Sequence, residues 1–392
     1  MSSLLIEAAP IHTRTPESVT ATATDVYELL VGVTSPDREL DSDAFDGVDW
    51  DALLRHASHH SLVPLLAHRV LDSNNCSLPA YIRARLRTEF QRNLFRNLGL
   101  LEELKRILAL WKELDIEAIP YKGPVLAEQL WGSFALRECS DLDLLVRRGD
   151  VERAGQELLT LDYDRVSPVA SSLCSALLRN ASEEQFRNSR NNIFLELQWA
   201  PAPRTLAVKY DDQRLWRNLT TVEVSGTRVH APGPEDLVAL LTIHGWKHNW
   251  SKLIWVADLA AAVRLGNIDW KLVQRTAEFG GWRRILLLGL EMVRRVYSLE
   301  TPLAVDPGVR ALARDLEQNL RAARNVSYAQ WHRGMLRARD RCAHQAQQLA
   351  YFIFTPGLAE YASIDLPRWA ASGYRLVRLA RVLRLSREKA LE

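Results

Sequence analysis

Residues 140–146 (Ser-Asp-Leu-Asp-Leu-Leu-Val) constrain the fold of this 392-residue chain more than any other segment. Because alternate residues of a β-strand point to the same face, Asp141 and Asp143 are expected side by side, opposite an aliphatic row. Like charges at such short range repel each other, and a divalent cation relieves the repulsion. The pattern therefore predicts a strand that carries a metal-binding carboxylate pair. The alternative is a surface turn that contains two aspartates by chance.

The residues before this segment predict a phosphate-binding corner. Residues 116–121 read as a short strand, and residues 124–131 have apolar side chains at helical spacing. Lys122-Gly123 would then lie where the strand passes into the helix, with Pro124 in the first helical turn. Glycine allows close approach of the backbone to a phosphate, and a helix N-terminus offers free N–H groups. Lys122 adds a positive charge, and Arg137 is placed to reach a phosphate or to clamp the loop.

This order of strand, Lys-Gly, helix, Arg and Ser-Asp-x-Asp strand resembles the nucleotidyltransferase superfamily of the DNA polymerase β type. It is most similar to a poorly characterised bacterial branch with a Lys-Gly corner and an Arg-x-x-Ser-Asp-x-Asp strand. The matching residues are Lys122, Gly123, Arg137, Ser140, Asp141 and Asp143. The usual superfamily corner is Gly-Gly or Gly-Ser. Here it is Gly123-Pro124, which removes one backbone N–H from the corner.

The resemblance implies a third carboxylate on a later strand, and Glu196 is the candidate. Residues 193–199 alternate between an aliphatic row and a row that includes Glu196. By resemblance, Glu196 activates the acceptor hydroxyl or binds a second metal ion. Asp141, Asp143 and Glu196 are then the catalytic residues and the ligands of Mg²⁺ or Mn²⁺. The alternative is that Glu196 faces solvent and that Glu183, Glu184 or Asp164 takes its role.

The same resemblance implies that Lys122, Gly123, Arg137 and Ser140 bind the phosphates, and it continues into a helix opened by residues 232–237. His244 and His248 lie one helical turn apart on one face, and Asp258 follows in a Trp-Val-Ala-Asp-Leu segment. These three are candidates for substrate contacts, and Lys247 is a candidate for a triphosphate contact. A zinc protease site is excluded because the Glu of its motif is missing. The alternative is a helix that packs on the core.

The expected fold class is α+β, with a small mixed β-sheet nucleotidyltransferase core flanked by helical regions. Residues 1–22 are polar and are expected to be disordered. Residues 23–114 form an N-terminal helical region, 115–230 the nucleotidyltransferase core, and 231–392 a C-terminal helical domain. Within the core, residues 222–224 and 227–230 flank Ser225-Gly226 and predict a hairpin.

The charge and composition of the chain limit the classes of partner and the cellular compartment that are expected. The net charge of +2 gives no global electrostatic case for nucleic acid. The four cysteines lack metal-ligand spacing, no apolar run is long enough for a transmembrane span, and no signal-peptide pattern opens the chain. A cytoplasmic protein is therefore expected. Five arginines recur every third residue from Arg375 to Arg387. They indicate a helix with its arginines in water, or a surface for RNA or an anionic membrane.

The expected activity is Mg²⁺-dependent transfer of a nucleoside monophosphate from an NTP, with ATP favoured, to a hydroxyl of an unknown acceptor. A small molecule or peptide is the favoured acceptor. One alternative is a toxin-like transferase that modifies tRNA or another RNA. Another is a nucleotide-binding module with the same fold and no turnover.

Overall fold

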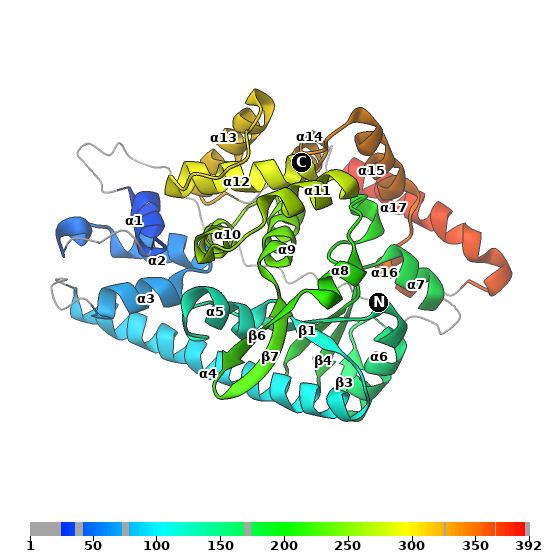
Figure 1. Ribbon diagram of the computed structural model, residues 1–392, viewed down its shortest axis with the longest axis horizontal. Coiled ribbons are helices and arrows are strands. Elements are labelled where there is room, and N and C mark those ends of the chain that lie inside the picture. The colour runs from blue at the N-terminus through cyan, green and yellow to red at the C-terminus, as the bar shows by residue number, and fades with distance from the viewer. Residues whose placement is uncertain are drawn as a thin grey trace.

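The computed structural model describes residues 25–35, 42–72, 78–167, 174–324, 327–364 and 366–388 (Figure 1). The disorder expected for residues 1–22 lies outside these ranges. The strands are β1 (Ala118–Pro120), β2 (Asp141–Val146), β3 (Tyr163–Arg165), β4 (Glu183–Asn188), β5 (Phe194–Gln198), β6 (Leu219–Val224) and β7 (Thr227–Pro232). The helices before β5 are α1 (Val26–Val33), α2 (Trp50–His59), α3 (Val63–Asp72), α4 (Ala80–Glu113), α5 (Gly123–Trp131), α6 (Val151–Thr160) and α7 (Cys174–Asn180).

The helices after β5 form most of the rest of the chain. They are α8 (Asp212–Arg217), α9 (Pro234–Lys247), α10 (Leu253–Leu265), α11 (Trp270–Gly280), α12 (Arg283–Tyr297), α13 (Pro307–Arg321), α14 (Tyr328–Arg337), α15 (Cys342–Phe354), α16 (Leu358–Ser363) and α17 (Tyr374–Glu388). Short 3-10 turns include η1 (Ser42–Phe45), η2 (Arg148–Asp150), η4 (Arg204–Leu206) and η5 (Arg368–Gly373).

A five-stranded mixed sheet has the order β1-β2-β5-β4-β3. β2 and β5 are parallel, whereas the other neighbouring pairs are antiparallel. The strands expected near residues 116–121, 141–146 and 193–199 are present, which confirms the α+β class. β3 and β4 were not predicted as strands.

One face of this sheet is apolar. Leu142 and Leu144 of β2 and Leu195 and Leu197 of β5 are buried in one hydrophobic cluster. The helices α4 and α6 cover this face and contribute, among others, Leu101, Leu104, Ile107 and Leu158 to the same cluster. Alternation along each strand therefore places Asp141, Asp143 and Glu196 on the opposite face, where Ile119 and Leu145 form a separate small apolar cluster with Leu215 and Leu240.

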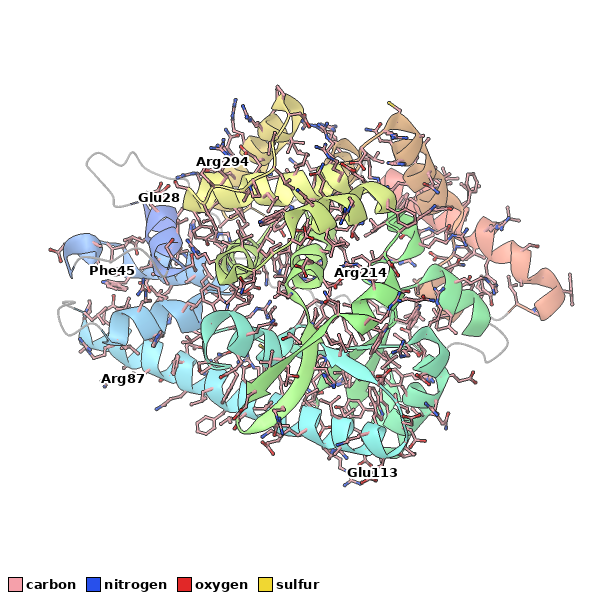
Figure 2. All side chains as sticks on the ribbon, in the orientation of Figure 1. Glu28, Phe45, Arg87, Glu113, Arg214 and Arg294 are labelled. Carbon is pink, nitrogen blue, oxygen red and sulfur yellow. The ribbon has the colours of Figure 1, made fainter. Side chains whose placement is uncertain are left out.

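The two helical regions, which are far apart in the sequence, share a second core. Leu30, Leu53 and Leu66 of the first three helices belong to one buried cluster with residues of α9, α10, α12 and α13. The 34-residue helix α4 connects the two cores, because Ile82 and Leu86 lie in this cluster whereas its C-terminal half lies against the sheet. Figure 2 labels Arg87 and Glu113 near opposite ends of α4. In Figure 1, α9 stands above the sheet and below α12.

The hairpin of β6 and β7 leads directly into α9. Ser225 and Gly226 have φ of 48° and 74°, as a two-residue hairpin turn requires, so the hairpin prediction is confirmed. Pro234 lies in the first turn of α9, where a backbone N–H would have no partner within the helix, so the lack of an N–H in proline costs no hydrogen bond. Among the described residues, no helix combines the length and the apolar character needed to cross a membrane.

The arginines of α17 lie partly against the protein. Arg378 and Arg381 both reach the buried carboxylate of Glu360, at 3.2 and 3.1 Å. Arg378 also donates to the carbonyl oxygen of Phe352. The side chains of Arg384 and Arg387 lie outside the described part of the chain.

Candidate active site

The register of the sheet brings the predicted carboxylates together. Asp143 of β2 is the direct neighbour of Glu196 on β5, and Gln185 of β4 is the neighbour of Glu196 on its other side. Asp141 lies two residues before Asp143, on the same face. The face opposite the apolar one therefore carries a polar row across three strands, and we call Asp141, Asp143 and Glu196 the carboxylate cluster.

Gln198 connects two members of the carboxylate cluster. Its Nε2 donates to Oδ1 of Asp143 at 2.7 Å and to Oε2 of Glu196 at 2.9 Å. The hydroxyl of Tyr121 donates to Oε1 of Gln198, which fixes the orientation of the amide. Gln185 donates to Oε1 of Glu196 at 3.2 Å. Both oxygens of Glu196 are thus held by neutral amides, which orient the carboxylate without cancelling its charge.

Lys122 neutralises part of the charge in the carboxylate cluster. Its Nζ lies 2.6 Å from Oδ1 of Asp143, and both side chains are nearly buried. Burial alone would lower the pKa of Lys122, but the charges of Asp143, Tyr121 and Glu196, together with the hydrogen bond to Asp143, outweigh burial and raise the pKa above its ordinary value. The lysine therefore stays positively charged within the site.

Burial, and after it the charge of Asp143, shifts the pKa of the other two carboxylates. Burial, reinforced by the charge of Asp143, raises the pKa of Asp141. Burial and then the charge of Asp143 raise the pKa of Glu196 to about 7. Ser140 donates to Oδ1 of Asp141 at 3.0 Å and partly offsets the effect. Burial and the neighbouring negative charge both disfavour the ionised carboxylates, and a bound cation would favour them.

The carboxylate cluster suits a divalent cation that is bound together with a substrate. Mg²⁺ prefers carboxylate oxygens and is usually held by one or two carboxylates plus substrate phosphates. Asp141 and Asp143 supply that donor set on one strand face. Within the described ranges, no group of three or more His, Cys, Asp or Glu side chains is arranged to enclose a metal ion by itself.

The N-terminus of α5 opens beside this cluster. Gly123 has a φ of 64°, which is favourable for glycine, and a Cβ at this position would lie 3.5 Å from the carbonyl oxygen of Asp141. Lys122 is the N-cap residue and makes no side-chain capping bond. Pro124 occupies the first turn, as predicted. The free N–H groups of this turn and the ammonium of Lys122 thus lie next to the carboxylates.

Arg137 is placed as a clamp of the loop between α5 and β2. Its Nε donates to Oδ2 of Asp258 at 3.0 Å, and both side chains are buried. Trp131 donates to the other oxygen of Asp258. The amides of Asn93 and Asn97 on α4 bind the carbonyl oxygen of Arg137. Of the two roles that the sequence suggested for Arg137, these contacts are those of the clamp.

His244 lies on α9 and His248 is the C-cap residue of that helix, both near the polar row. Their ring centroids are 4.7 Å apart, and both rings contact Trp255. Burial, reinforced by the charges of Lys247 and Lys122, lowers the pKa of His248 to about 3. Burial and the charge of Lys122 also lower the pKa of His244. Both imidazoles are therefore neutral at pH 7 and able to donate or accept a hydrogen bond.

The structure also locates Lys247 and the other carboxylates that were considered for the third catalytic position. Lys247 pairs with Glu183 at 3.1 Å, on the same sheet face as Glu196. Glu184 lies on the other face and pairs with Arg165. Asp164 lies on β3, separated from β5 by β4. Of the carboxylates considered for the third position, Glu196 is the one that neighbours Asp143 in the sheet.

Three residues of the site were missed in the sequence: Tyr121, Gln185 and Gln198. Gln198 lies two residues after Glu196, so period-two alternation places it on the same face and could have found it. Gln185 needed the strand β4, whose residues 183–188 contain one apolar side chain, Phe186. Tyr121 directly follows β1 and belongs to no recognisable motif.

The comparisons with known proteins concern both sequence and structure. Residues 46–298 match the sequence family described as "Uncharacterised nucleotidyltransferase". Among curated proteins, no sequence matches this chain. A solved structure, described as an antigenic nucleotidyltransferase-like protein from Paracoccidioides brasiliensis, is 15% identical and has a TM-score of 0.32. The similarity covers 60% of this chain and 97% of that one. At this TM-score the overlap of the folds is too low to support an inference.

Proposed function

The chain belongs to this family of uncharacterised nucleotidyltransferases, and we propose that it transfers a nucleoside monophosphate from an NTP to a hydroxyl group in a Mg²⁺-dependent reaction. One observation carries the proposal. Asp143 and Glu196 are direct neighbours on parallel strands, with Asp141 on the same face and the N-terminus of α5 beside them. A site with oxygen ligands, a lysine and free N–H groups suits a triphosphate.

Asp141 and Asp143 would hold the divalent cation. When bound, Mg²⁺ offsets the negative charge of the triphosphate and of the reacting phosphorus. The N–H groups of the first turn of α5 orient the phosphate oxygens. Lys122, which now pairs with Asp143, lies in a position to donate to a phosphate oxygen as well.

Glu196 is proposed to take the proton of the acceptor. The carboxylate accepts the hydroxyl proton as the acceptor oxygen forms its bond to the α-phosphorus. The bond between the α-phosphorus and the oxygen that bridges to the β-phosphorus breaks, and pyrophosphate leaves with that electron pair. Gln185 and Gln198 hold Glu196 in place through its two oxygens. Arg137 and Asp258 act indirectly, because they fix the loop that leads into β2.

The experiment is a labelling reaction. Purified protein is incubated with each α-³²P-labelled NTP, ATP first, with Mg²⁺ or Mn²⁺, and with cell extract divided into RNA, protein and small-molecule fractions. We expect label in the small-molecule or protein fraction. Asp141→Asn should abolish it, whereas the matched control Asp164→Asn, on an exposed strand position of the same sheet, should not.

The other outcomes separate the alternatives. Label in the RNA fraction would identify an RNA-modifying enzyme. NTP binding without label in any fraction would contradict the proposed transfer and favour a binding module. Label that persists in Asp141→Asn would contradict the assigned site.

A further inference from the structure

A cavity of about 320 Å³ adjoins the polar face of the sheet at β4. Residues from β4, η4, the end of α9, and the segment from Thr355 to Arg378 line it. A volume of this size suits a small molecule or a small terminal group. A folded macromolecule would not enter such a space.

The cavity lies on the far side of the proposed base from the phosphate corner. Across the sheet, Lys122 and Gly123 follow β1, Asp141 and Asp143 lie on β2, and Glu196 lies on β5. The cavity begins at the next strand, β4. In an in-line displacement, the attacking and leaving oxygens lie on opposite sides of the phosphorus. With the pyrophosphate at the α5 corner, the acceptor therefore comes from the β4 side.

Gln185 joins the cavity to the base. It lines the cavity, and its Nε2 lies 3.2 Å from Oε1 of Glu196. A hydroxyl that enters from the cavity would meet Glu196 at this oxygen, which can accept a second hydrogen bond beside the one from the amide. The cavity is thus one side chain away from the atom that is proposed to take the proton.

The charged groups of the lining already have partners. Lys247 pairs with Glu183 at 3.1 Å, and Arg378 pairs with the buried Glu360 at 3.2 Å. A charged acceptor would have to break one of these pairs or remain unpaired, which is costly in a partly buried site. The charge of the lining therefore favours an uncharged acceptor.

The rest of the lining can bind hydroxyl groups. Ser182, Thr205 and Thr355 provide hydroxyls that both donate and accept, and Gln185 provides an amide. Pro203 and Leu358 add apolar surface for C–H groups. Alternating hydroxyl and C–H groups are characteristic of sugars and polyols.

The outer wall of the cavity lies beyond the region that defines the family. The family match ends at residue 298, whereas Thr355, Leu358 and Arg378 belong to the following segment. The core that would bind the nucleotide and the wall that would select the acceptor are therefore separate parts of the sequence.

We infer that this cavity is the acceptor site and that the acceptor is a small, uncharged, polyhydroxylated molecule of the sugar or polyol class. This inference rests on the proposed nucleotidyl transfer. It assigns the choice of acceptor to the segment from Thr355 to Arg378, and the choice of reaction to the carboxylate cluster.

The first test asks for the chemical class of the acceptor. The small-molecule pool of a cell extract is divided by ion exchange into neutral, anionic and cationic fractions, and each is incubated with the full-length protein, Mg²⁺ and α-³²P-labelled ATP. We expect label in the neutral fraction. Periodate cleaves the C–C bond between carbons that carry neighbouring hydroxyls. Treating the neutral fraction with periodate, and quenching the periodate before the reaction, should reduce labelling at least tenfold.

The second test asks whether the acceptor binds in the cavity. Leu358→Trp and Thr205→Trp fill it from two different elements, and Leu349→Trp, at an exposed position of α15, is the matched control. Each cavity variant should raise the KM for the neutral acceptor at least tenfold. The Kd of Mg²⁺-ATP should stay within twofold of wild type. The control should change neither value. Circular dichroism confirms the fold of each variant.

The outcomes separate this inference from the function on which it rests. Label confined to the anionic or cationic fraction, and lost in Asp141→Asn, would overturn the acceptor class and leave nucleotidyl transfer standing. A wild-type KM in both folded cavity variants would overturn the location. Absence of label from all three fractions and from protein and RNA would contradict the proposed function itself.

Discussion

The two faces of the five-stranded sheet are built from the same strands and have opposite properties. On β2, Leu142 and Leu144 are buried against α4 and α6, whereas Asp141 and Asp143 occupy the other face. The apolar face gains stability from burial. The polar face gathers three carboxylates, two of them with a raised pKa, and so lowers stability in the absence of a cation. The comparison indicates that one face maintains the fold and that the other is arranged for a ligand.

The largest effect is expected on the polar face. Asp141→Asn should lower nucleotidyl transfer by about 10³-fold, the upper end of the range for losing one preorganised electrostatic group. Its melting temperature without metal should not fall, because the change removes a carboxylate whose ionised form is disfavoured by burial and by Asp143. Labelling assays and thermal denaturation measure the two effects. A stable variant with full activity would break the comparison between the faces.

Glu196→Gln should separate binding from chemistry. The amide keeps the size of the side chain but cannot take a proton, so transfer should fall about 10²- to 10⁴-fold. The Kd of Mg²⁺-ATP, measured by calorimetry, should stay within a few-fold of wild type. Loss of nucleotide binding instead would identify Glu196 as a metal ligand or a structural residue.

The apolar face should show the reverse pattern. Ile107 on α4 is fully buried in the cluster below the sheet. Ile107→Ala should lower the free energy of unfolding by about 2–5 kcal/mol, because it leaves a cavity in a packed core. Transfer per folded molecule should stay within about threefold of wild type. Denaturant titration and the labelling assay check both values. A loss of activity without a loss of stability would show that the faces are not separable.

The smallest effect concerns the pH dependence of stability without metal. The pKa of Glu196 is about 7 in the folded protein, above its ordinary value of 4.5. Between these values the folded state holds a proton that the unfolded state has released, so stability falls as the pH rises from 4.5 to 7. Denaturant titrations in EDTA at pH 5 and pH 7.5 should show a smaller fall for Glu196→Gln than for wild type. An equal fall in stability for the two proteins would contradict the raised pKa of Glu196.

The local features of the site could be predicted from the sequence. Period-two alternation identified β2 and β5, and the Lys-Gly-Pro order identified the start of α5. The apolar rows were long enough to mark these strands. β4 was missed because Phe186 is the one apolar residue between Glu183 and Asn188, so its formation as a strand depends on pairing with β5.

The long-range contacts could not be predicted. Arg137 and Asp258 are buried partners although 121 positions separate them, and no local pattern connects them. Gln198 acts through contacts with two strands at once. From the sequence, the N-terminal and C-terminal helices were expected to form two separate regions. In the structure, α1 to α3 share one core with α9 to α13. Such contacts depend on how the strands and helices are arranged in the complete fold, and local sequence patterns do not specify that arrangement.

The central claim is that the carboxylate cluster catalyses nucleotidyl transfer, and the position of the transferred label tests it most directly. Parallel reactions with α-³²P-ATP and γ-³²P-ATP are run with Mg²⁺ and the acceptor fraction, and pyrophosphate release is measured. The account predicts label on the acceptor from the α-phosphate alone, with one pyrophosphate released for each labelled acceptor. Label from the γ-phosphate, with ADP as the product, would show phosphoryl transfer and contradict it.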